Sequence, residues 1–371
     1  VDRGSIGISN NLSTLYSKER SLSQIKFRGG SVEFIESLEK RKDKRDNKLD
    51  QIIIKNIQGE QIKRVKFHHG YFTSTSAPRE KIDYRLKLES IEIFGNNDNV
   101  TPLSYKYSYN EGSKLPPYFK SSATERSYYG QDKWGYANGV KSNTHLVFAI
   151  PPSSPSYSYR ADRRCDESYM KAFVLNRVDY PTGGYSVFEM EANKGESGNL
   201  VGGLRVAQIR SKTDNSSGEL ITKFSYESPI YVFDPGFKEY RYEMYPCWNG
   251  PSGRGEIVMN KGNQPQVYYT DTPFSSMGFY SGSPVIYKKV TKKQISNGMS
   301  IGKTIYIYDE PDTYFYMLED GQSYMYIPSH RYDFHTIPLP WSSGKLLEEN
   351  IYKEGDDYPS KTTKNKYKTI Y

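Results

Sequence analysis

Alternation of apolar and polar residues with a period of two dominates this chain. In Ser104–Tyr109, three tyrosines fall on one side of an extended backbone while Ser and Lys fall on the other, as a half-exposed strand requires. The same kind of pattern recurs at 61–67, 86–94, 304–308 and 323–327. Helical periodicity is nearly absent: only 32–45 fits a helix, and its first residues suit a strand equally well. The pattern therefore predicts very little helix.

Short polar clusters that contain glycine separate these segments. They lie at 28–30, 57–60, 94–97, 214–218 and 319–322. Gly, Asn and Asp supply the positive φ angles or the side-chain hydrogen bonds that tight turns need. We therefore predict an all-β fold in which antiparallel hairpins and meanders form large curved sheets, arranged as a sandwich, an open barrel or a rolled-up sheet.

The segment 149–158 is the best candidate for a domain boundary, because a run so rich in Pro and Ser cannot form a central strand. It divides the chain into an N-terminal β domain, 1–150, and a C-terminal β domain, 151–371. The alternative is a long loop inside one continuous β unit, since such insertions also occur on the rims of sheets.

Composition strengthens the β prediction. Hydrophobic residues make up only 36% of the 371 residues, yet aromatic residues make up 15% and include 35 Tyr and 16 Phe. The core must therefore be aromatic, with many ring hydroxyls at half-exposed faces or interfaces. A chain of this length forms one large or two medium domains with a substantial core.

Charge argues against nucleic-acid binding. The formal net charge of +8 comes from interspersed signs, and no acid-free basic cluster or base-reading motif accompanies it. The densest run, 39–46, mixes both signs and is expected to be a solvated hairpin tip. No segment is apolar over the length of a membrane-spanning helix.

Candidate reactive groups are few. His330 and His335 flank Asp333 and would form a polar cluster if the loop folded back, whereas His68 and His69 are adjacent and point to opposite faces of a strand. Cys165 and Cys247 form either one long-range disulfide or two unrelated thiols. We predict no catalytic residue, no metal ligand and no cofactor.

Three tryptophans offer aromatic faces on which a sugar ring can stack: Trp134, Trp248 and Trp341. For Trp134, which lies between Asp132 and Gly135, a structural role is favoured, as an anchor that holds a loop under the sheet with its indole N–H bonded to a carbonyl. Carbohydrate binding is thus the alternative function, and a hydrolase built on His330, Asp333 and His335 is a third.

Several blocks carry a resemblance to a known family. The segments 181–191 and 202–206, together with 86–91, 115–117, 131–139 and 282–290, resemble blocks found in the same order in Rhs-like, YD-repeat-containing bacterial proteins, in the region upstream of their Tyr-Asp repeats. The segment 350–355 resembles a degenerate first repeat, with Lys353 in the place of the repeat's Asp. Together the blocks span most of the chain.

The resemblance implies long β-sheets that curl into a shell, and it supplies no catalytic residues for this region. It also implies an extracytoplasmic location, secreted or on the cell surface. From it we expect a non-catalytic structural or interaction module. Its partner is expected to be the downstream part of the same polypeptide, or a protein or glycan surface.

Overall fold

The computed structural model describes residues 20–74, 76–117, 129–148, 160–214, 216–231, 283–309 and 344–368, together with the backbone of four short strands at 238–241, 266–269, 313–315 and 336–338. The helical elements in this part of the chain are short: the 3-10 turn η1 (Lys81–Asp83), the four-residue α1 (Glu167–Met170) and a single 3-10 residue at Tyr129. The prediction of an all-β chain with very little helix is confirmed.

Fourteen strands form one antiparallel sheet. In the N-terminal half they are β1 (Gln24–Phe27), β2 (Gly30–Lys40), β3 (Asn47–Asn56), β4 (Gln61–Thr73), β5 (Tyr84–Phe94), β6 (Leu103–Tyr109) and β7 (Leu175–Asp179). In the C-terminal half they are β8 (Tyr185–Lys194), β9 (Leu200–Lys212), β10 (Leu220–Tyr231), β13 (Val285–Ser296), β14 (Met299–Tyr308), β17 (Leu346–Tyr352) and β18 (Lys361–Lys364). Two small hairpins stand apart, β11 (Lys238–Arg241) with β12 (Gln266–Tyr269), and β15 (Thr313–Phe315) with β16 (Thr336–Pro338).

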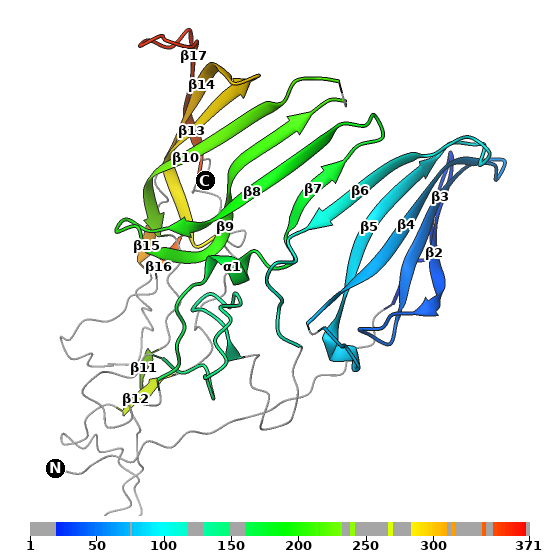
Figure 1. Ribbon diagram of the computed structural model, residues 1–371, viewed down its shortest axis with the longest axis horizontal. Coiled ribbons are helices and arrows are strands. Elements are labelled where there is room, and N and C mark those ends of the chain that lie inside the picture. The colour runs from blue at the N-terminus through cyan, green and yellow to red at the C-terminus, as the bar shows by residue number, and fades with distance from the viewer. Residues whose placement is uncertain are drawn as a thin grey trace, which may run out of the picture.

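The order of strands in the large sheet follows the order of the chain, with only the two small hairpins inserted. Where a short turn joins two strands, their pairing follows from local turn chemistry. The pairs β6 with β7, β10 with β13 and β14 with β17 form across longer segments. The predicted turns at 28–30, 57–60, 94–97 and 214–218 all lie between consecutive strands. Figure 1 shows the result as a curved, open sheet, with β8 and β9 facing the viewer and β13, β14 and β17 turned toward edge-on.

Two details at the N-terminal end bear on the sequence predictions. The ambiguous segment 32–45 is a strand over its first part, within β2. The charged run between β2 and β3 is a hairpin tip, but Asp43 is not solvated: its side chain is 4% exposed, pairs with Arg41 at 2.7 Å and accepts the Leu86 N–H at 3.0 Å. Burial acts to raise the pKa of Asp43, but these hydrogen bonds lower it overall.

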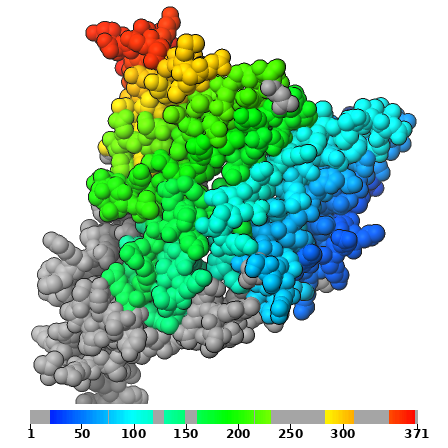
Figure 2. Space-filling view, viewed as in Figure 1, coloured from blue at the N-terminus to red at the C-terminus, as the bar shows by residue number. Residues whose placement is uncertain are grey.

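The sheet continues across the proline-rich segment that we chose as a domain boundary. Strand β6 precedes that segment and β7 follows it, and the two pair directly, with Lys106 opposite Asp179. In the space-filling view the N-terminal and central strands form one broad surface (Figure 2). The division into 1–150 and 151–371 stays a prediction, with one continuous β unit as its alternative.

Fully buried hydrophobic side chains are few in the described part of the chain. The largest cluster of them consists of Val201, Val285 and Tyr287, with Trp134 and Tyr226 packed against it. Most sheet residues keep intermediate exposure. The sheet is therefore held by strand pairing and cross-strand side-chain contacts over much of its area, and by a packed core at only a few places.

Candidate functional site

The best-organised region outside the sheet is a pair of segments, 129–148 and 160–174, which we call the docked loop. It leaves the sheet after β6 and returns at β7, and Figure 1 shows it with α1 at the lower ends of β7 to β9. Its two segments are joined by a hydrogen bond from the Ala161 N–H to the Val147 carbonyl, at 2.9 Å. Asp166 caps α1, its side chain accepting the N–H groups of Ser168 and Tyr169. The docked loop is thus a folded element with little regular secondary structure.

Asp132 is the polar centre of the docked loop. Its side chain is completely buried, with 0% exposure. One carboxylate oxygen accepts the Trp134 N–H at 2.9 Å and the Tyr136 N–H at 3.0 Å, and the other accepts the Cys165 thiol at 3.2 Å. Burial raises the pKa of Asp132, although these hydrogen bonds act in the opposite direction. Such a carboxylate organises the turn around it.

Cys165 is a free thiol in this structure. Burial, followed by the negative charge of Asp132, raises its pKa. A thiol whose pKa is raised stays protonated, and the thiolate is the reactive form of cysteine. Cys165 therefore acts as a hydrogen-bond donor to Asp132, and Cys247 lies outside the described residues.

Arg163 and two asparagines hold the backbone of the docked loop. Arg163 is buried and donates from Nη2 to the Asp132 carbonyl at 2.7 Å and from Nε to the same oxygen at 3.1 Å. Asn138 and Asn143 are also buried, and both donate to the Asp162 carbonyl, at 3.2 and 2.8 Å. The carbonyls in these turns thus accept hydrogen bonds from side chains, where carbonyls in a sheet would accept them from a neighbouring strand.

Trp134 fastens one end of the docked loop to the sheet. It packs against the cluster of Val201, Val285 and Tyr287, directly over Gly202, where an added Cβ would lie 2.7 Å from the Trp134 Cβ. The next residue, Gly203, has a φ of 90°, and the register between β8 and β9 shifts at this point. Gly202 therefore leaves the room that the indole occupies on the sheet, and Gly203 supplies the positive φ of the bulge.

This contact brings together three of the sequence blocks, 131–139, 202–206 and 282–290. Tyr287 adds a polar link, since its hydroxyl accepts the Lys194 N–H at 3.1 Å and lies 3.2 Å from Asn193 Oδ1. Above the ring, the Arg205 guanidinium carbon lies 4.7 Å from the centroid. The packing supports the interpretation of Trp134 as a loop anchor; its alternative role, in ligand stacking, stays a prediction.

Phe173 fastens the other end of the docked loop. Its ring stacks on Phe72 of β4 with the centroids 4.4 Å apart, and Tyr109 meets the same Phe72 ring edge-on at 5.0 Å. Phe173 has a φ of 63°, which is unfavourable for a residue with a bulky side chain. This contact could not be predicted from the sequence, because a positive φ at Phe cannot be read from residue type.

A groove with a volume of about 540 Å³ lies between the docked loop and the N-terminal half of the sheet. Arg85, Pro116, Pro117, Tyr136 and Tyr169 are among its lining residues. The groove is open, and its walls are aromatic and proline-rich with one guanidinium. Chemically it offers surfaces for apolar contact and hydrogen bonding.

Several predicted residues lie outside the described residues: Trp248, Trp341, His330, Asp333 and His335. Their proposed roles stay predictions. Within the residues that the structure describes, no three His, Cys, Asp or Glu side chains come together in a way that suits a metal ion.

The two adjacent histidines of β4 have different surroundings. His68 Nε2 lies 2.8 Å from Glu92 Oε2, whereas His69 stands opposite Leu88 and its ring stacks on Phe67 at 6.2 Å. Burial lowers the pKa of His69, and the positive charge of Lys48 lowers it further. His69 is therefore held neutral inside the sheet.

We expect the half-buried His69 to make the chain less stable in acid. Because the pKa of His69 is lowered in the folded chain, the unfolded chain binds a proton first, and stability is lost as the pH falls below about 6.5. Urea unfolding between pH 8 and pH 5 should show a smaller decrease for His69→Leu than for the wild type. His68→Leu is the matched control, and an equal change in both variants would contradict the assignment.

Comparison of the chain with models of protein families and with curated proteins gives no match. None of the helices in the described part of the chain has the length and apolar character that crossing a bilayer requires. The likeness to Rhs-like proteins therefore rests on the sequence blocks alone.

Proposed function

We propose that this chain is a non-catalytic structural module of a larger secreted or cell-surface protein of the Rhs-like kind. In this proposal the curved sheet serves as a scaffold, or as one section of a shell, against which the downstream part of the same polypeptide packs. A long antiparallel meander suits this role, because each added strand widens the sheet without changing how the other strands pair.

One observation carries the proposal: an apolar row on one face of the N-terminal half of the sheet. Five residues on five neighbouring strands form this row, each directly opposite the next: Phe34, Ile52, Val65, Ile93 and Leu103. The first four are only partly buried, and Leu103 is 55% exposed. We call this set the apolar row.

An in-register row of large apolar side chains is the inner surface of a two-layer β structure in most proteins. Here it is still partly open to solvent. Contiguous apolar surface of this kind marks a site of protein contact. The apolar row is thus suited to a second layer, which the scaffold proposal assigns to the remainder of the parent polypeptide.

The proposal predicts that Leu103→Asp weakens association with that remainder at least tenfold, because burying an unpaired charge at a contact costs more than about 1.4 kcal/mol. The chain and the remainder would be produced separately, mixed, and followed by sedimentation velocity. Leu38→Asp is the matched control: Leu38 is 102% exposed and lies outside the apolar row. Equal binding by both variants, or no association by the wild type, would contradict the proposal.

A further inference from the structure

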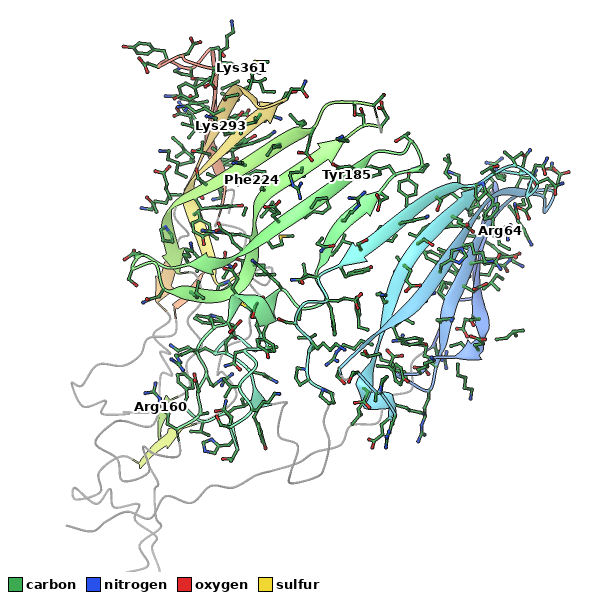
Figure 3. The ribbon with its side chains drawn as sticks, in the orientation of Figure 1. Arg64, Arg160, Tyr185, Phe224, Lys293 and Lys361 are labelled. Atoms are coloured by element: carbon green, nitrogen blue, oxygen red, sulfur yellow. The ribbon has the colours of Figure 1, made fainter. Side chains whose placement is uncertain are left out.

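Three lysines stand side by side on one face of the C-terminal half of the sheet. Lys223 of β10 is directly opposite Lys293 of β13, and Lys293 is directly opposite Lys303 of β14. All three side chains are exposed, and Lys293 is labelled in Figure 3. Because neighbouring strands are about 4.8 Å apart, three cationic side chains leave the sheet at close, regular intervals. We call this set the lysine row.

The lysine row is an exception in this sheet. Elsewhere, charges that stand directly opposite each other have opposite signs: Lys66 and Glu92, Lys106 and Asp179, Glu191 and Arg205, Glu227 and Lys289, and Glu348 and Lys364. In the described registers, like charges stand directly opposite only within the lysine row. Since such pairs destabilise a sheet, the row lowers folding stability.

Acids on the same face do not neutralise the row. Glu227 is engaged by Lys289 at 3.1 Å, and Glu348 by Lys364 at 3.5 Å. Lys303 lies over the Tyr352 ring, 5.0 Å from its centroid. Among the described residues, no carboxylate forms an ion pair with any member of the lysine row, so its positive charge remains available to a partner.

We propose that the lysine row docks a protein partner through a row of carboxylates on a facing β-sheet. Strands in any sheet have the same spacing, so acids on successive partner strands come opposite successive lysines. Ile221 and Ile295 flank the row on one side and Ile305 flanks it on the other, which provides apolar surface for face-to-face packing.

The neighbourhood of the row favours a protein over a nucleic acid. Glu227 and Glu348 lie on the same face, where they would repel a continuous phosphate backbone. An acidic protein surface can instead match each charge separately, and complementary charges fix the register of two partners. The inference rests on the scaffold role proposed above, because it takes the partner to be another folded part or protein.

The test uses fluorescently labelled poly-L-glutamate as the probe and fluorescence anisotropy with the whole chain at low salt. We expect saturable binding that Lys293→Glu weakens about tenfold, since one attraction is lost and one repulsion is added. The same substitution should raise the unfolding temperature, because it gives the row alternating signs. Lys292→Glu is the matched control: it makes the same change of charge on the same strand, but faces Phe224 and Thr304 on the other side of the sheet.

Unchanged binding by Lys293→Glu, or equal weakening by Lys292→Glu, would overturn the inference. Tighter binding of duplex DNA or heparin through the same lysines would also overturn it, in favour of a different class of partner. Failure of the scaffold proposal is distinguishable: if poly-L-glutamate does not bind while Leu103→Asp still prevents association with the remainder of the polypeptide, only the lysine row loses its assignment.

Discussion

Replacement of Asp132 by Ala should destabilise the docked loop by about 3 kcal/mol. The substitution leaves two backbone N–H groups and a thiol without their acceptor, in a place where the side chain is completely buried. Each unsatisfied buried donor costs about 1–3 kcal/mol. Urea unfolding, together with hydrogen exchange of the 129–148 amides, measures the loss.

Asp132→Asn is the matched control, because an amide keeps one carbonyl oxygen for the N–H groups of Trp134 and Tyr136. It should cost only about 1 kcal/mol. Burial raises the pKa of Asp132, so its carboxyl group binds a proton more tightly in the folded chain than in the unfolded chain. The wild type should therefore gain stability relative to Asp132→Asn as the pH falls from 7 toward 4. Equal losses in Ala and Asn variants would show that the hydrogen bonds are not what the carboxylate contributes.

Replacement of Trp134 by Ala should cost a similar amount, about 3 kcal/mol, since it removes a large ring from a packed cluster. The loss should appear as faster hydrogen exchange in 129–148 and a lower unfolding midpoint. Trp134→Phe keeps part of the contact over Gly202 and should retain most of the stability.

The Trp134 experiment also separates the two roles considered for this residue. An anchor predicts a loss of stability in Trp134→Ala. A side chain used only for stacking on a ligand predicts an unchanged unfolding midpoint together with lost binding on a glycan array. The first outcome is expected, because the ring is packed against Val201 and Tyr287.

Three of the sequence blocks pack together at the docked loop, and this structural role does not depend on the family resemblance. Trp134, from the block 131–139, lies over the glycine bulge in the block 202–206. Val285 and Tyr287, from the block 282–290, complete the cluster. Phe173 makes a separate contact with β4. The docked loop thus contacts strands that are far apart in the sheet, β9 and β13 through Trp134 and β4 through Phe173.

The period-two pattern of this chain was sufficient to predict these strands and turns, because most pairs of neighbouring strands in the meander are joined by a short turn. Strands β4, β5, β6 and β14 contain the segments marked by alternation alone, and the glycine-containing clusters between strands supplied the turns. The expected strand at 323–327 lies outside the described residues and stays a prediction. Local rules were adequate where consecutive strands pair through a short turn, but they did not predict the pairing of β6 with β7, β10 with β13 or β14 with β17, which long segments separate.

Only the tertiary structure decided which distant residues meet. Residue type and spacing give no sign that Asp132 accepts the Cys165 thiol, that Phe173 takes a positive φ to reach Phe72, or that Asp43 is buried in a charged hairpin tip. The lysine row likewise depends on the register of three strands, and a shift of one residue would place its members on opposite faces. The sequence determined the strands through local alternation, whereas long-range packing and register, which depend on contacts between distant residues, determined the surfaces.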